Sequence, residues 1–210
     1  MNREPLFPVF GIQRLRMETD GAGVTTLVGL LGCPLRCRYC LNPHAGRPDT
    51  PHRSMTAEAL IAELAVDDVY FTATGGGVTF GGGEPLLHAG AILEFARKRP
   101  GAWRICLETS LHAPSSVLES LLPVVDGFIV DVKDLDPERY ARYTGGSIEP
   151  MLANLRALSA HADRVRVRVP EIEGYNTAED CDRTEAALRQ MGFRNIERFH
   201  YVTDPRRLRR

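Results

Sequence analysis

The feature that most constrains the fold of this chain is a series of six short β-rich runs separated by segments with helical patterns. One of them, FIVDV at residues 128–132, is apolar almost throughout, as strands are when helices cover both faces of a parallel sheet. Strands that alternate with helices predict parallel βα units. We therefore predict an α/β fold, an open six-unit relative of the βα barrel. The six runs begin at Val24, Gly76, Trp103, Gly127, Arg164 and Asn195.

Capping signals mark where helices begin between these runs. Ser, Thr and Asp at such positions accept hydrogen bonds from the first backbone N–H groups of a helix. The predicted starts are Thr56, Ser116 with Glu119 as a capping box, Asp136 before Pro137, and Thr177 with Asp180. Because we find no repeats, low-complexity segments or interior linkers, we predict a single domain over residues 1–210.

Composition excludes several classes of protein. Hydrophobic residues make up 43% of the chain and charged residues 25%, as in ordinary globular proteins. The net charge of −1 offers no basic excess to neutralise phosphates, so we expect no nucleic-acid partner. No stretch approaches the roughly 18 apolar residues of a membrane span, and the N-terminus lacks the apolar core of a signal peptide. We therefore expect no membrane partner and a cytoplasmic location.

Three of the five cysteines are packed into nine residues directly after the first predicted strand. GCPLRCRYC places thiols at Cys33, Cys37 and Cys40, while Cys106 and Cys181 stand alone. This distribution indicates a ligand or redox site rather than a disulfide framework. A [4Fe–4S] cluster normally takes four thiolates, so three cysteines would leave one iron open to another ligand.

Two other uses of these cysteines remain open at this point. His44 or His52 could complete a Cys3His zinc site. Cys37 and Cys40 also have thioredoxin-like spacing, although that motif usually opens a helix in a different context.

Two further motifs fall at predicted strand ends, where barrel enzymes place their chemistry. In GGGEP the glycines let a backbone approach a ligand closely, and Glu84 could receive an ammonium group; a Gly-Pro turn is the alternative. In DVK, Asp131 and Lys133 lie on the same side of a strand because side chains repeat every two residues. A buried ion pair or a solvated strand end is the alternative for DVK.

The CxxxCxxC spacing, with Tyr39 before the last cysteine, resembles the signature of the radical S-adenosylmethionine (SAM) superfamily. GGGVTFGGGEPLL and VDVKDLDPERYARYTG are similar to the activating enzymes of glycyl-radical enzymes, with pyruvate formate-lyase activase as the nearest type. The resemblance runs from about residue 10 to residue 201. It implies a partial (β/α)6 barrel of the radical SAM type.

The resemblance also implies a ligand set. Cys33, Cys37 and Cys40 would hold one [4Fe–4S] cluster, and SAM would chelate the open iron. Lys133 would face the SAM carboxylate, Asp131 the ribose or a cation, Ile172 the adenine, and Arg168 the cofactor or the substrate. The implied cofactor contacts are Tyr39, Leu41, Gly82, Gly83, Glu84, Glu108, Thr109, Asp131, Val132, Lys133, Arg168 and His200.

The chain departs from the family pattern at several of these positions. Gly81 replaces a common serine, and LETS at residues 107–110 replaces Asp-Thr-Asn, which helps to bind a monovalent cation in the type enzyme. With Glu108 and Thr109 at these positions, the sequence leaves open whether a monovalent cation is also a cofactor. The family's final histidine aligns most simply with Val202, so His200 takes its role only if the strand register shifts by two.

The activity that the resemblance implies is reductive cleavage of SAM with an electron from a flavodoxin or ferredoxin. The 5′-deoxyadenosyl radical would abstract a glycine Cα hydrogen from a glycyl-radical enzyme, the expected partner. Two alternatives also begin with reductive cleavage of SAM but differ in the target. One is a radical SAM enzyme acting on a small molecule or peptide, and the other is an activase of anaerobic ribonucleotide reductase. Since no cysteine lies between Cys40 and Cys106, we expect one cluster per chain.

Overall fold

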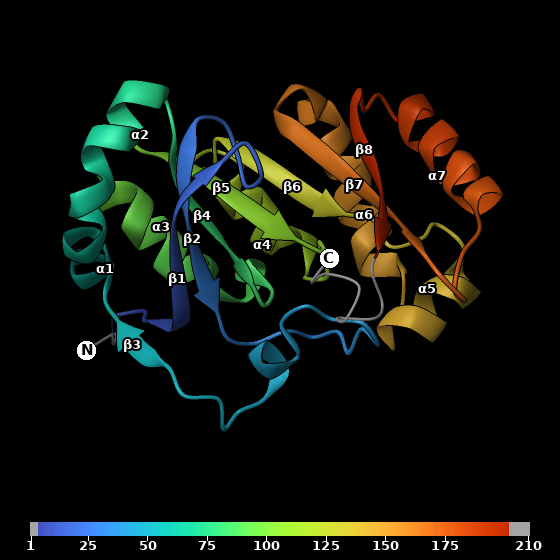
Figure 1. Ribbon diagram of the computed structural model, residues 1–210, viewed down its shortest axis with the longest axis horizontal. Coiled ribbons are helices and arrows are strands. Elements are labelled where there is room, and N and C mark those ends of the chain that lie inside the picture. Colours follow the sequence, from blue (N-terminus) through green and yellow to red (C-terminus); the bar gives the residue numbers. More distant parts are fainter. Residues whose placement is uncertain (1–3, 202–210) are drawn as a thin grey trace, which may run out of the picture.

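The computed structural model describes residues 4–201. Strands and helices alternate along most of the chain, and the helices pack around a curved sheet (Figure 1). The strands are β1 Phe7–Met17, β2 Val24–Leu30, β3 Arg53–Met55, β4 Gly77–Gly82, β5 Arg104–Thr109, β6 Gly127–Asp131, β7 Val165–Ile172 and β8 Asn195–Tyr201. The α-helices are α1 Ala57–Leu64, α2 Asp68–Thr74, α3 Ala89–Lys98, α4 Ser115–Leu121, α5 Pro137–Thr144, α6 Glu149–Leu158 and α7 Ala178–Gln190.

One sheet contains every described strand, in the order β3-β1-β2-β4-β5-β6-β7-β8. The six strands from β2 to β8 along this order pair in parallel, which confirms the six predicted runs. β3 and β8 lie at opposite edges, so the sheet does not close. The described chain therefore forms a partial (β/α)6 barrel, as predicted.

Two strands were not predicted from the sequence. β1 pairs antiparallel with β2, and β3 pairs antiparallel with β1. The β1–β2 register shifts twice, and Leu15 and Glu18 have positive φ values. This irregular hairpin extends the parallel sheet on the side away from β8.

The core lies between the outer faces of the strands and the helices. The ring of Phe7 stacks face to face on that of Phe80, with centroids 5.2 Å apart. The ring of Phe95 packs edge-on against both, at 6.2 Å from Phe7 and 5.2 Å from Phe80. All three side chains are fully buried. Side chains of this size supply much of the apolar area that a fold removes from water. The packing fixes β1, β4 and α3 relative to one another.

Three of the four helix starts predicted from capping signals are confirmed. Thr56 caps α1, Asp136 caps α5, and Thr177 forms a capping box with Asp180 at α7. The capping box predicted at Ser116 is wrong. Pro114 occupies the cap position of α4 without a side-chain bond, and the N–H of Val117 already donates to its carbonyl, so Ser116 lies within the first turn.

None of the helices within residues 4–201 has the combined length and apolar character needed to cross a bilayer.

Candidate functional site

The cysteine loop leaves the carboxyl end of β2 and is held by backbone hydrogen bonds. The N–H groups of Arg36 and Arg38 donate to the carbonyls of Thr144 and Tyr143, at 2.8 and 3.1 Å. The hydroxyl of Tyr201, at the end of β8, donates to the carbonyl of Tyr39. Elements from both halves of the sheet thus position the loop.

A cavity of about 310 Å³ opens at this carboxyl edge and brings most of the predicted site residues together. All three cysteines reach it, with Cys33 and Cys37 half-buried and Cys40 exposed. The strand ends around it are those that barrel enzymes use for catalysis. The predicted residues that line it are Cys33, Cys37, Cys40, Leu41, Gly82, Gly83, Glu84, Glu108, Thr109, Asp131, Lys133 and Arg168.

The spacing of the three thiols does not suit a single zinc ion. Thiolates around one tetrahedral zinc, with bonds of about 2.3 Å, lie roughly 3.8 Å from one another. Among the described residues, Cys33, Cys37 and Cys40 do not gather within 4.8 Å of one another. Three thiols on one cavity are a ligand set that an iron–sulfur cluster can use.

Burial favours the protonated form of the Cys33 and Cys37 thiols in the free protein. Desolvation raises the pKa of Cys33, and it raises the pKa of Cys37 to about 11 although Lys133 opposes the shift. Metal binding to such thiols must release protons, because the thiolate is the ligand. Cys106 and Cys181 are buried elsewhere and do not line the cavity.

The GGGEP turn at the end of β4 lies against the start of the cysteine loop. The N–H of Gly83 donates to the carbonyl of Leu30 at 2.9 Å, and the N–H of Glu84 donates to that of Gly32 at 2.7 Å. A Cβ atom on Gly83 would lie 2.2 Å from the Gly32 carbonyl oxygen. Only glycine permits this approach, so the turn fixes where the cysteine loop begins.

Glu84 is buried, with 1% of its surface exposed, and its carboxylate is fully hydrogen-bonded. One oxygen accepts from Thr109 Oγ1 at 2.5 Å and from the Leu86 N–H at 3.2 Å. The other accepts from the Ser110 N–H and Oγ at 2.9 and 2.6 Å. Burial raises the pKa of Glu84, and these hydrogen bonds oppose the rise. Glu84 therefore ties the end of β4 to the end of β5; its contact with an ammonium group stays a prediction.

Asp131 and Lys133 form an ion pair at the end of β6, with Nζ 2.9 Å from Oδ2. The Lys133 side chain is only 13% exposed. Burial disfavours its charged form, but the Asp131 carboxylate outweighs that effect and the pKa of Lys133 is raised. A cationic group is thus held permanently at the cavity wall.

Glu108 faces a second built-in cation. Its Oε1 lies 2.5 Å from Arg168 Nη1, and the Nη2 of Arg168 donates to the carbonyl of Thr19. Burial and the nearby Asp131 raise the pKa of Glu108, and Arg168 opposes this. Both acidic groups expected near a cation, Asp131 and Glu108, are therefore already paired with resident cations.

The structure places three predicted cofactor contacts outside the cavity wall. The His200 side chain is 85% exposed and lies 3.6 Å from Glu171, because its neighbours on β8 face the cavity and it faces away. Val132 is fully buried in the core, and the Tyr39 ring packs on Tyr175. The side chains of His200, Val132 and Tyr39 therefore do not line the cavity, and their contact with the cofactor stays a prediction.

Two further predictions fall elsewhere. Ile172 is buried and does not line the cavity. Val202 lies outside the described residues.

Sequence reasoning also missed residues that line the cavity. Glu197, Phe199 and Tyr201 reach it from β8, and alternation along that strand would have found them once one was known to face inward. Tyr143 reaches it from α5, a helix face that strand alternation does not reveal. The residues not predicted are Leu35, Asn42, Ser110, Tyr143, Glu197, Phe199 and Tyr201.

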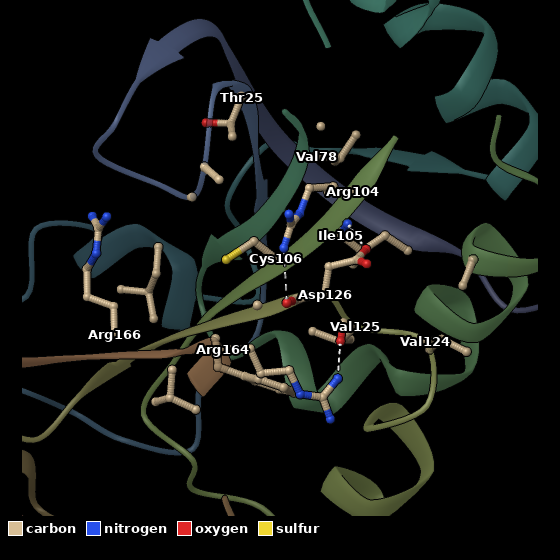
Figure 2. A pocket seen from close by; sticks show the side chains of 18 of the residues that line it. Thr25, Val78, Arg104, Ile105, Cys106, Val124, Val125, Asp126, Arg164 and Arg166 are labelled. Carbon is tan, nitrogen blue, oxygen red and sulfur yellow. Dashed lines mark hydrogen bonds between the residues drawn. The ribbon is translucent and has the colours of Figure 1, made fainter. Parts of the chain in front are cut away.

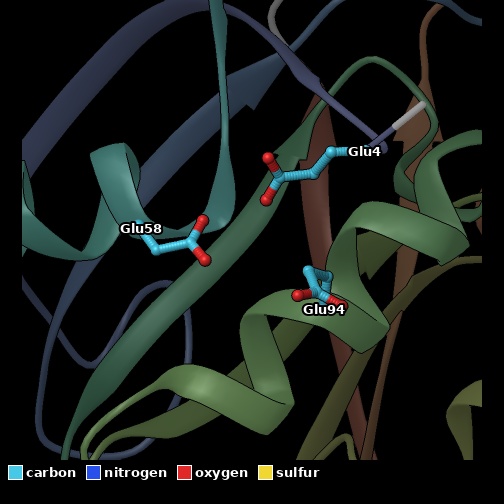
Figure 3. Close-up of side chains that lie close together, drawn as sticks. All are labelled: Glu4, Glu58 and Glu94. Atoms are coloured by element: carbon cyan, nitrogen blue, oxygen red, sulfur yellow. The ribbon is translucent and has the colours of Figure 1, made fainter. Parts of the chain in front are cut away.

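A cluster of three carboxylates lies apart from this cavity, on the outer surface. Glu4, Glu58 and Glu94 bring their oxygens within 4.8 Å of one another (Figure 3). The ammonium of Lys98 pairs with all three carboxylates, at 3.5 Å from Glu4 and 2.5 Å from Glu94. The lysine supplies the positive charge, so this cluster is not a metal centre.

Comparison with known proteins agrees with this geometry. Residues 28–179 match the radical SAM superfamily. The (2S)-3-sulfopropanediol dehydratase activating enzyme of Klebsiella oxytoca is 29% identical over 84% of this chain and 74% of its own length. The pyruvate formate-lyase-activating enzyme of Staphylococcus aureus is 32% identical over 77% of this chain and 67% of its own length.

Solved structures share the fold. Streptococcus suis SuiB bound to S-adenosylmethionine superposes with a TM-score of 0.62 at 12% identity, over 82% of this chain and 39% of that one. A radical SAM methyltransferase from Sphaerobacter thermophilus gives 0.53 at 16% identity, over 96% of this chain and 79% of that one. The chain thus spans about two fifths of the first structure. It belongs to the radical SAM superfamily and, within it, to the class of glycyl-radical enzyme activating enzymes.

Proposed function

We propose that this chain activates a glycyl-radical enzyme: a 5′-deoxyadenosyl radical takes a hydrogen atom from a glycine Cα of that partner, which leaves a glycyl radical and 5′-deoxyadenosine. Cys33, Cys37 and Cys40 would hold one [4Fe–4S] cluster, with one iron left for SAM. The three thiols at one cavity and the glycine turn beside them fit such a cluster. When bound, the cluster supplies one electron to the SAM sulfonium, which yields methionine and a 5′-deoxyadenosyl radical.

The single observation that carries this proposal is the convergence of the thiols, the GGGEP turn and the Asp131–Lys133 pair on one cavity. Lys133 supplies a charge opposite the SAM carboxylate. The backbone at Gly82 and Gly83 lets the methionine part of SAM come close. Tyr143 and Phe199 give the wall apolar surface that excludes water from the reacting atoms.

The partner is inferred from the activating-enzyme relatives. The sheet does not close between its edge strands, so a glycine-bearing loop could enter from the side. A flavodoxin or ferredoxin would supply the electron. All five cysteines are free, which suits the reducing cytoplasm.

The test of the proposed function is a transfer of label. With reconstituted protein, a low-potential reductant, SAM and a peptide copied from a partner's glycine loop, deuterium on the glycine Cα should appear in 5′-deoxyadenosine. Mass spectrometry of that product measures it. A peptide with alanine in place of the glycine is the control. If SAM is cleaved but label from the glycine never appears with any partner sequence, the substrate assignment fails while the cofactor assignment stands.

We also propose that Arg168 and Lys133 replace a diffusible monovalent cation. The affinity for SAM, measured by calorimetry at constant ionic strength, should then change by less than about twofold between potassium and choline salts. Arg168→Met uncovers the Glu108 carboxylate, so that variant should gain a dependence on potassium. Arg156→Met, an exposed change on α6, should behave like the parent. A tenfold gain in SAM affinity with potassium in the parent protein, about 1.4 kcal/mol, would contradict the proposal.

A further inference from the structure

A second and larger cavity lies at the opposite end of the sheet. Its volume is about 690 Å³, and it shares no lining residue with the candidate site. It is lined by the first residues of the parallel strands, among them Gly77 of β4, Arg104 of β5, Gly127 of β6 and Val165 of β7. Nothing in the proposed reaction uses this end of the barrel.

Successive layers of side chains separate the two cavities. Arg168 and Glu108 line the candidate site, while Arg166 and Cys106, two positions earlier on the same strands, line the second cavity. Because side chains repeat every two residues along a strand, both layers face the inside of the barrel. A ligand in the second cavity would therefore lie beneath the Arg168–Glu108 pair without touching SAM.

Positive charge dominates this second cavity. Among the described residues, neither Arg104, Arg164 nor Arg166 forms an ion pair with a carboxylate. Arg104 and Arg166 each reach one backbone carbonyl, at 3.5 and 2.8 Å. The ionisable residues of the lining, apart from Cys106, are Arg99, Arg104, Arg164, Arg166, Asp126 and Asp163. Four arginines against two aspartates leave an excess of two positive charges.

The hydrogen-bonding capacity of these arginines is only partly used. Arg164 donates through Nη1 alone, to the carbonyls of Leu122 and Val125 at 3.0 and 2.7 Å. Figure 2 shows its side chain and that of Arg104 reaching the loop at Val125 and Asp126 from two directions. The Nε of Arg99 is buried and has no hydrogen-bond partner. A guanidinium group carries five N–H donors in a planar fork, so free donors remain beside the cavity.

We propose that this cavity binds a small polyvalent oxyanion, either a polyphosphate or a polycarboxylate. Guanidinium groups match the paired oxygens of phosphate and carboxylate. The volume lies within the range of small-molecule sites, about 300 to 1,000 Å³. Pro123 and Val124, which are at least partly exposed, add apolar lining for an organic part of the ligand.

The experiment uses reconstituted protein with saturating SAM, so that the candidate site is occupied. Calorimetry with inorganic triphosphate, ATP and citrate, at constant ionic strength, should detect binding of at least one of them. Arg104→Gln should weaken that binding about tenfold or more, the loss of one charge-assisted hydrogen bond. Arg104 is exposed and makes only one weak contact, so this variant should fold. Asp163→Asn should strengthen the same binding.

The control is Arg156→Gln, which removes the same charge from the exposed face of α6. Equal binding of triphosphate and ATP would identify phosphate groups as the ligand chemistry. Binding of ATP alone would show that the nucleoside is also contacted. Binding of citrate alone would identify carboxylates as the ligand chemistry. Each of these supports the proposal. It is overturned if none of the three anions binds at millimolar concentration, if they displace SAM, or if Arg156→Gln weakens binding as much as Arg104→Gln.

Discussion

Replacing any one of Cys33, Cys37 and Cys40 by Ala is expected to abolish both the cluster and the cleavage of SAM. A cubane held by only three thiolates loses a third of its protein ligands with each change. After anaerobic reconstitution, iron and sulfide analysis should fall from about four of each per chain to a small residual amount. Chromatography should detect no 5′-deoxyadenosine from the variants under reducing conditions.

Cys106→Ala and Cys181→Ala are the matched controls. Both thiols are buried outside the candidate site, where burial raises the pKa of Cys106 to about 12 and that of Cys181 to about 11. These variants should keep the iron and the activity. Loss of iron in either control would show that the ligands were wrongly chosen, and a colourless protein holding one zinc would refute the cluster itself.

The parallel half of the sheet could be predicted because its signals are local. Each of the six runs is short and rich in β-forming residues, and three of the seven described α-helices begin with a side chain that caps the first turn. β1 and β3 could not be predicted in the same way. Pro8 interrupts the first residues of β1, positive φ values break it at Leu15, and β3 has only three residues. Their place in the sheet depends on pairing with distant segments.

The candidate site was predictable to the extent that it lies at the ends of parallel strands. Such ends meet at one edge of the sheet, so Glu84, Glu108 and Asp131 came together as the motifs implied. The direction of the side chains on β8 was not predictable, because a shift of the strand by one residue turns its other face toward the cavity. His200 was considered for the cofactor from the family's final histidine and a register shift of two, whereas its neighbours Phe199 and Tyr201 are the residues that face the cavity.

The partners of the charged residues were likewise hidden from the sequence. Glu108 and Arg168 are 60 residues apart, and nothing in either motif indicates that they meet. Their pairing requires β5, β6 and β7 to be adjacent in register, which the sheet supplies. The same pairing places the Arg168 guanidinium on the carboxylate at which the sequence had left a monovalent cation open.

Gly83→Ala is expected to have the second large effect, because the added methyl group has no space. Its Cβ would lie 2.2 Å from the carbonyl oxygen of Gly32 and 2.6 Å from that of Leu30. Both are backbone atoms, so the GGGEP turn must move away from the cysteine loop and break the bonds at 2.9 and 2.7 Å that join them. We expect a loss of about 2 to 4 kcal/mol in the free energy of unfolding, measured with urea on the cluster-free protein.

The displaced turn should also separate the glycine backbone from the thiols, so SAM binding to reconstituted Gly83→Ala should be lost. Gly46→Ala is the matched control, since a Cβ there meets nothing within 4 Å and should change the stability by no more than about 0.5 kcal/mol. If Gly83→Ala binds SAM with the parent's affinity, the turn does not contact the cofactor. If it also keeps the parent's stability, the close approach of the two loops is not needed for the fold, and the bonds of the cysteine loop to Tyr143, Thr144 and Tyr201 are enough to hold it.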